Sequence, residues 1–224
     1  MLTLAAMGTL LSVNVGRPEP TVHSDPGVTA IGKKPVDGPV RVSAPTAEKG
    51  VSGLAGDAIC DVRHHGGVDQ AVYAYAREEL DAWAEELGRP LPHGMFGENL
   101  TTRGLAVSDA LIGERWRIGA TLLLEVSATR IPCRTFAGWM EQERWVKTFT
   151  DRARPGAYLR VLTPGAIRAG DEITVVHTPD HGVSSADVFR ALHSRAPEML
   201  PLMLDLPGLS AGHRESAAKR LNAR

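Results

Sequence analysis

Cysteine is scarce in this sequence, which has only Cys60 and Cys133 among its 224 residues. Small secreted domains that lack a large core are held together by several disulfides. Two cysteines that lie far apart in the chain, in different surroundings, exclude a framework of that kind. Each thiol is therefore interpreted from its own neighbours.

An excess of charge of one sign is also lacking. The chain has 25 basic and 26 acidic side chains, with a formal net charge of −1. Proteins that neutralise many nucleic-acid phosphates carry a surplus of Lys and Arg, so this balance disfavours nucleic acid as the main partner. A local basic cluster around a small anionic ligand remains compatible with this overall charge balance.

Long apolar runs are absent as well, since no stretch reaches the ~20 apolar residues that a membrane-spanning helix needs. The apolar N-terminal residues 1–15 have no basic start, and Ser12 and Asn14 alternate there with apolar side chains. This pattern favours a buried first strand over a signal peptide. We therefore expect a cytoplasmic protein without membrane contact.

Glycine and proline, by contrast, are plentiful, with 23 and 15 residues. Between residues 8 and 176 they separate short strand-like runs at close intervals, a pattern typical of a closed or strongly curved β structure with many corners. The predicted strands include residues 40–42, 71–75, 122–128, 158–162 and 173–176. The fold class expected is mainly β, a barrel with a few helices.

Two helices interrupt this pattern. Residues 77–87 place apolar side chains on one face before Gly88, and residues 138–149 carry Trp145 and Phe149 at i, i+4 spacing, which indicates core packing. After Thr178 the sequence pattern changes, and it predicts three helical segments, residues 185–194, 197–206 and 210–222. The sequence therefore predicts a barrel domain over 1–178 and a three-helix domain over 179–224.

The last helical segment is basic. Its charged side chains could form a nucleic-acid-binding face but more often form a solvated surface, and a recognition helix cannot be distinguished here from the sequence alone. These side chains are His213, Arg214, Lys219, Arg220 and Arg224.

Cys133 is the strongest candidate for chemistry. It follows a hydrophobic strand and lies between Arg130 and Arg134. Neighbouring guanidinium groups favour the thiolate, which is both the nucleophile and the soft metal ligand. The alternative is a buried, inert cysteine. Cys60 belongs to a predicted alternating strand, residues 58–62, and is interpreted as structural.

A polar loop over residues 63–70 combines cationic, imidazole, glycine and carboxylate groups. Its glycines allow backbone N–H groups to approach an anionic ligand, although a plain polar turn remains an alternative. A zinc site is the other competitor, but adjacent histidines point apart in an extended chain and no compact set of four ligands is visible. The candidate residues are Arg63, His64, His65, Gly66, Gly67 and Asp69.

Two further clusters are candidates for ligand binding. Residues 95–101 place Phe96, Gly97, Glu98 and Asn99 on one short turn, which fits either pocket lining or turn capping. Lys33 and Lys34 precede a proline in a loop, where paired lysines hold a phosphate or are simply exposed.

Together these clusters resemble the MOSC domain family, named for the C-terminal domain of molybdenum cofactor sulfurase. The resemblance covers most of the chain and is closest to short bacterial members that reduce hydroxylaminopurines. Six motifs carry it in the family's order: residues 11–16, 33–36, 56–57 with 64–67, 69 with 71–75, 96–101, and 130–133. It implies a closed β-barrel, a molybdopterin cofactor, and a cysteine that coordinates molybdenum, a role that maps onto Cys133.

The terminal helices resemble the three-helix domain of the hydroxylaminopurine-reducing members. No pyridoxal-phosphate domain precedes the barrel, so sulfurase activity is not expected. The resemblance implies a molybdenum-dependent oxidoreductase that reduces N-hydroxylated compounds, with a place in the detoxification of 6-N-hydroxylaminopurine. Nothing in the chain resembles a flavin, haem or nicotinamide site, so we expect electrons from a separate flavoprotein or iron–sulfur reductase.

On this hypothesis the cofactor is bound by residues from all the polar clusters. They are Lys33, Lys34, Arg63, His64, His65, Gly66, Gly67, Asp69, Phe96, Gly97, Asn99 and Arg130. Glu98, Asp69 or His65 is the candidate proton donor. Two other functions stay open: a carrier of the cofactor or of sulfur without reductase activity, and a nucleic-acid-binding module with the barrel as sensor. A homodimer is the default assembly.

Overall fold

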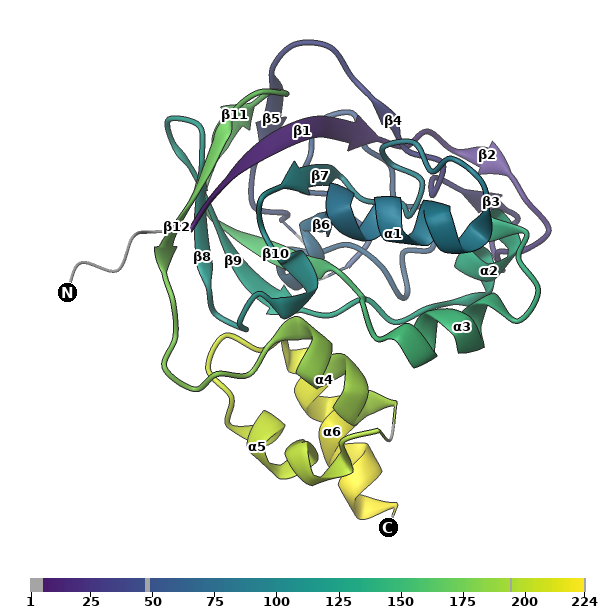
Figure 1. The fold of residues 1–224 in the computed structure, drawn as a ribbon, viewed down its shortest axis with the longest axis vertical. Coiled ribbons are helices and arrows are strands. Elements are labelled where there is room, and N and C mark those ends of the chain that lie inside the picture. The colour runs from purple at the N-terminus through teal and green to yellow at the C-terminus, as the bar shows by residue number, and fades with distance from the viewer. Residues whose placement is uncertain (1–5, 47–48, 194, 224) are drawn as a thin grey trace.

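A closed antiparallel-rich β-barrel forms the body of the molecule (Figure 1). The computed structural model describes residues 6–46, 49–193 and 195–223. Neighbouring strands follow the order β12-β8-β9-β10-β6-β7-β1, and pairing of β12 with β1 closes the ring. The barrel strands are β1 (Met7–Val15), β6 (Val72–Ala76), β7 (Leu100–Arg103), β8 (Arg115–Ile118), β9 (Leu122–Ala128), β10 (Ala157–Thr163) and β12 (Glu172–His177). The predicted barrel is confirmed.

Short strands extend the barrel at its rim. β4 (Lys34–Pro35) pairs with the end of β1, β5 (Val40–Val42) with β11 (Gly165–Ile167), and β2 (Glu19–Pro20) with β3 (Val28–Thr29). The first strand begins at Met7, and residues 1–5 of the predicted strand lie outside the described residues.

The core has two parts because β6 is buried on both faces. Val72 and Ala74 point into the barrel, whereas Tyr73 and Tyr75 point into an aromatic cluster outside it. Helix α1 (Arg77–Leu87) covers that cluster with Trp83, and Gly88 ends the helix at φ 62°, as its sequence predicts. Both faces of β6 are therefore shielded from water by apolar side chains.

The predicted helix over residues 138–149 is wrong in its extent. The structure has two helices, α2 (Arg134–Met140) and α3 (Trp145–Arg152), separated by Glu141 and Arg144 at φ 49° and 56°. These two left-handed residues turn the chain, although neither is glycine. The predicted core role of the aromatic pair is confirmed, since Trp145 is 1% and Phe149 0% exposed.

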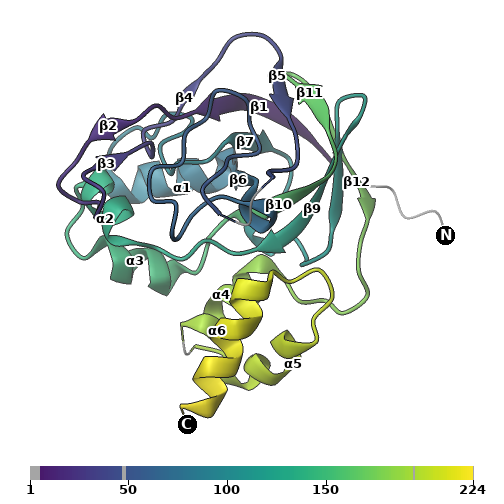
Figure 2. The same cartoon turned by 180° about the vertical axis from the view of Figure 1, so that it is seen from behind.

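The C-terminal helices pack against one end of the barrel (Figures 1 and 2). They are α4 (Ser185–Leu192), the short 3-10 turn η3 (Pro197–Met199) with α5 (Leu200–Leu204), and α6 (Ala211–Asn222). Ser184 begins α4 with a capping box that includes Asp187. The helices and the barrel interior share one hydrophobic cluster, and the domain boundary near residue 178 stays a prediction. Ser194, at the end of the first predicted helix, lies outside the described residues.

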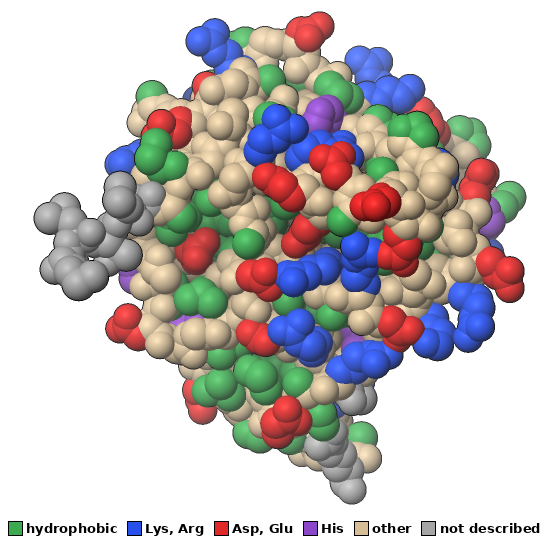
Figure 3. All heavy atoms as spheres, viewed as in Figure 1, with side chains coloured by type: hydrophobic (Ala, Val, Ile, Leu, Met, Phe, Trp, Pro, Cys, Tyr) green, Lys and Arg blue, Asp and Glu red, His purple; other side chains and the backbone are tan. Residues whose placement is uncertain are grey.

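Charge is evenly mixed over the face that carries α1. Figure 3 shows basic and acidic side chains interspersed there, without a large area of one sign. No helix in the described residues combines the length and apolar composition needed to cross a bilayer.

His213 connects α6 to the barrel and is not part of a basic surface. Its ring is 7% exposed, with Nε2 3.1 Å from the Thr129 carbonyl oxygen and Nδ1 3.0 Å from the Ser210 hydroxyl. A neutral ring satisfies both contacts, by donating from Nε2 and accepting at Nδ1. Burial lowers the pKa of His213 from 6.5 to about 4.

Acidification should therefore destabilise the protein through His213. Because the folded-state pKa lies below the unfolded value, this contribution is complete above pH 6.5 and is lost as pH falls toward 4. We expect His213→Gln to remove about 2 to 3 kcal/mol of the pH dependence of unfolding between pH 7 and 4. Denaturant unfolding of both proteins measures it. The exposed His177→Gln serves as control, and an equal pH dependence in all three proteins would contradict the assignment.

Candidate functional site

Two neighbouring cavities meet at Cys133. The first, of about 100 Å³, lies among Lys33, Cys60, Gly97, Asn99 and Arg130, and the second, of about 450 Å³, extends to the start of α6. The residues that line both are Asp61, His65, Gln70, Cys133, Thr135 and Tyr158. A group bound at the Cys133 sulfur would therefore face both spaces.

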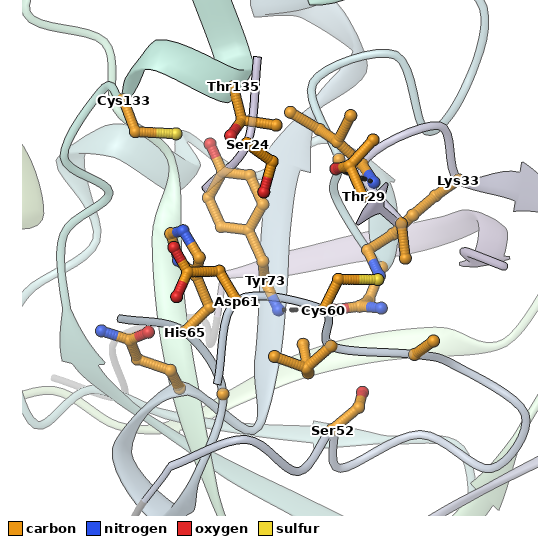
Figure 4. Close-up of a pocket in the computed structure, with 18 of the residues that line it drawn as sticks. Ser24, Thr29, Lys33, Ser52, Cys60, Asp61, His65, Tyr73, Cys133 and Thr135 are labelled. Atoms are coloured by element: carbon orange, nitrogen blue, oxygen red, sulfur yellow. Dashed lines mark hydrogen bonds between the residues drawn. The ribbon is translucent and has the colours of Figure 1, made fainter. Parts of the chain in front are cut away.

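The Cys133 side chain is partly exposed and points into the first cavity (Figure 4). The hydrophobic strand β9 ends at Ala128, and Cys133 follows as the N-terminal cap of α2. Its sulfur accepts a hydrogen bond from the backbone N–H of Phe136 at 3.5 Å. The thiol is thus held at the cavity wall, with room on its other side for a ligand.

Arg130 places a buried cation in the same wall. The residue is 7% exposed, its guanidinium lies 3.9 Å from the Phe136 ring centroid and 5.0 Å from that of Tyr73, and it donates to the Phe96 carbonyl. Among the described residues no carboxylate forms an ion pair with it. A buried charge is costly without a counter-charge, so this guanidinium is suited to an anionic ligand.

The two predicted lysines are separated by the structure. Lys33 lines the first cavity, where its ammonium pairs with the fully buried carboxylate of Asp57, and burial lowers the pKa of Lys33. Asp57 also accepts from Ser52 at 2.7 Å and from the Asn99 amide at 3.0 Å. Lys34 is exposed on β4 and lines neither cavity.

The glycine loop approaches the cavity through His65 and Gly66. Gly66 has φ 75°, a left-handed conformation that glycine adopts without strain, and it lines the first cavity. Burial and then the charge of Arg130 lower the pKa of His65 from 6.5 to about 4. His65 is therefore uncharged at neutral pH and does not act there as an imidazolium proton donor.

Several predicted residues lie away from the first cavity. Arg63 is exposed and pairs with Asp25 at 3.0 Å, and His64 lines only the second cavity. Phe96 is buried in the aromatic cluster, and Gly67, at φ 91°, begins the turn that contains Asp69. Within the described residues no three His, Cys, Asp or Glu side chains are placed to hold a metal ion together.

The proposed proton-donor roles of Glu98 and Asp69 disagree with the geometry. Glu98 is fully buried and accepts from the N–H groups of Gly94 at 2.6 Å and Phe96 at 3.0 Å, and from Thr101 at 2.9 Å. Asp69 pairs with Arg160 at 2.8 Å. Neither side chain lines either cavity, because one organises its own turn and the other belongs to an ion-pair network.

Glu98→Gln should consequently affect stability and not chemistry. An amide presents one acceptor oxygen, so a buried backbone N–H loses its partner, and we expect unfolding to become easier by about 1 to 3 kcal/mol. Turnover per bound cofactor should stay within about twofold, whereas loss of a general acid would lower it by about 100-fold or more. Denaturation and steady-state kinetics measure the two effects separately.

Sequence reasoning missed several residues of the cavities. Residues 58–62 form a loop and not the predicted strand, so Cys60 lines the first cavity, and burial raises the pKa of its thiol. Cys60 and Cys133 approach the cavity from different sides (Figure 4). Tyr73, Tyr158 and Gln70 were also missed, since in sequence they look like ordinary strand or turn residues.

The fold and this site define a closed β-barrel protein with a thiol and a buried cation in a ligand cavity. The family model for the MOSC domain matches residues 61–174. The chain belongs to the MOSC domain family, and the resemblance found in its motifs is confirmed.

Individual relatives agree with this assignment. YflK of Bacillus subtilis is 31% identical over 177 residues, which cover 79% of this chain and 76% of YflK. A protein of Gibberella moniliformis named "Reductase" is 32% identical over 192 residues, or 84% of this chain but only 33% of that longer protein. The crystal structure of YiiM from Geobacillus stearothermophilus superposes with a TM-score of 0.76 at 29% identity, over 96% of this chain and 99% of YiiM.

Proposed function

We propose that this protein is a molybdenum-cofactor-dependent reductase of N-hydroxylated compounds such as hydroxylaminopurines. The observation that carries the proposal is the buried Arg130 guanidinium, which has no carboxylate partner among the described residues and lines the same cavity as the Cys133 thiol. A soft thiolate ligand beside a cation matches a metal held by a negatively charged organic cofactor. The name of the fungal relative supports reductase chemistry.

The donor set of the first cavity fits such a cofactor. Arg130 would face its anionic groups, the backbone at Gly97 would contact its polar edge, and Cys133 would ligate the metal. Lys33 and Asn99, which both hold Asp57, would complete the cavity wall beside it. Ligand pockets usually enclose about 300 to 1,000 Å³, so the cofactor would extend past Cys133 into the space that the two cavities share. When bound, molybdenum supplies two-electron redox chemistry.

The overall reaction consumes two electrons and two protons. The N–O bond of R–NH–OH breaks, R–NH₂ forms, and the oxygen leaves as water. Asp61 and His65 line both cavities and would pass protons to the leaving oxygen, His65 as a neutral ring that accepts a proton at one nitrogen while it donates from the other. The electrons come from a separate flavoprotein or iron–sulfur reductase.

Isolation from a molybdenum-replete host tests the proposal. We expect about one molybdenum per chain and turnover of 6-hydroxylaminopurine with a chemically reduced dye as electron donor. Metal-free protein with labile sulfur on Cys133 would instead indicate a sulfur carrier. Protein that holds molybdenum but reduces no N-hydroxylated compound would indicate a cofactor carrier, and either result would overturn the reductase.

A further inference from the structure

Two residues that line the second cavity carry a buried polar side-chain atom without a partner among the described residues. Thr129 is 1% exposed, and its hydroxyl has no hydrogen-bond partner in the described part of the chain. The same holds for the side-chain oxygen of Gln70. Both residues line the second cavity, as do Gly212 and Ser216 of α6.

Unpaired polar atoms of this kind indicate a ligand. Buried hydroxyl and amide groups nearly always form hydrogen bonds, because an unpaired one costs about 1 to 3 kcal/mol. Thr129 both donates and accepts, and the Gln70 amide has one end of each type. His213, which lines the same cavity, is uncharged and has both ring nitrogens engaged. The cavity therefore suits a ligand that has both a hydrogen-bond donor and an acceptor.

We infer that the second cavity binds a heterocycle with hydrogen-bond donors and acceptors through Thr129 and Gln70, and that residue 212 limits the size of this ligand. On the proposed function, the heterocycle is the body of the substrate. Its N-hydroxyl group then points toward Cys133, which lines the same cavity. The C-terminal helices thus form part of the binding site.

A side chain introduced at Gly212 would occupy part of the second cavity. Gly212 lies in the first turn of α6, four residues before Ser216, so a side chain there would share the helix face of Ser216, which lines the cavity. A Cβ atom added at Gly212 meets no atom within 4 Å, and its φ is not positive. Leucine is also a better helix former than glycine, so Gly212→Leu should fold.

Calorimetric titration of the holoprotein with adenine, a heterocycle that has no N-hydroxyl group to reduce, tests the site. Gly212→Leu should weaken adenine binding by at least about tenfold, and Thr129→Val, which removes only the hydroxyl, by about tenfold. Glu215→Leu adds a side chain of the same kind on an exposed part of α6 that lines neither cavity, and should stay within about twofold. No binding by the wild type, or equal binding by Gly212→Leu, would overturn the inference.

Kinetics separate this inference from the proposed function. Gly212→Leu should raise the KM for 6-hydroxylaminopurine by at least about tenfold and leave the KM for the small N-hydroxyurea within about twofold, at unchanged molybdenum content. An equal change in both KM values would count against a size limit at residue 212. If the protein reduces neither compound but adenine binding follows the expected pattern, the reductase proposal fails and the binding site stands.

Discussion

Cys133→Ser should abolish molybdenum retention and, with it, reductase turnover. A serine hydroxyl is a hard, weakly acidic group that does not replace a thiolate on this metal. Loss even of a residue that only orients a metal ligand lowers metal affinity by about 10- to 100-fold, so removal of the ligand itself should lower molybdenum content and turnover by at least about 100-fold. Metal analysis and steady-state kinetics on the same preparations measure both.

This substitution should leave the fold intact. Cys133 caps α2 by accepting the Phe136 N–H, and serine is a preferred residue at that position. Thermal unfolding of the cofactor-free proteins should therefore be unchanged or slightly improved. Cys60→Ser is the matched control, because Cys60 lines the first cavity from another side. Equal molybdenum loss in both variants, or retention in Cys133→Ser, would show that Cys133 is not the specific ligand.

Regular local patterns made much of the fold predictable. Strands 122–128 and 40–42 and helix 77–87 have the bounds that their sequences indicate, since alternation, helical periodicity and Gly88 all act within a few residues. The break between α2 and α3 was not predictable in this way. Glu141 and Arg144 adopt left-handed conformations that the sequence usually marks with glycine.

The site was predictable only in part, because side-chain direction depends on tertiary packing. Seven of the predicted site residues line the first cavity, as the sequence clusters suggested. They are Cys133, Arg130, Lys33, Asn99, Gly97, His65 and Gly66. Glu98 has the sequence surroundings of a pocket carboxylate, yet it folds back onto the N–H groups of its own turn. The unpaired hydroxyl of Thr129 becomes visible only when α6 is placed against the barrel.

Arg130→Met should remove the cofactor while changing stability little. The guanidinium is buried without a carboxylate partner among the described residues, so its removal relieves a desolvation cost. Methionine keeps much of the packing against Phe136 and Tyr73. Loss of the hydrogen bond to the Phe96 carbonyl destabilises the protein and offsets the lower desolvation cost. We expect unfolding of the cofactor-free protein to change by less than about 2 kcal/mol and molybdenum content to fall at least about tenfold.

Arg160→Met is the matched control for Arg130→Met, and we expect it to destabilise the protein without removing molybdenum. Arg160 pairs with Asp69 and Glu125, both at 2.8 Å, so its removal leaves the partly buried Asp69 without a counter-charge, whereas Glu125 keeps its ion pair with Arg115 at 2.8 Å. We expect a loss of about 1 to 3 kcal/mol in unfolding free energy, with molybdenum content unchanged in the folded protein. The two variants should differ because Arg160 has carboxylate partners and so stabilises the apoprotein, whereas Arg130 has none among the described residues and is available to bind an anionic ligand. If Arg130→Met retained full molybdenum, or destabilised the apoprotein more than Arg160→Met, Arg130 would be a structural residue and not an anion-binding one.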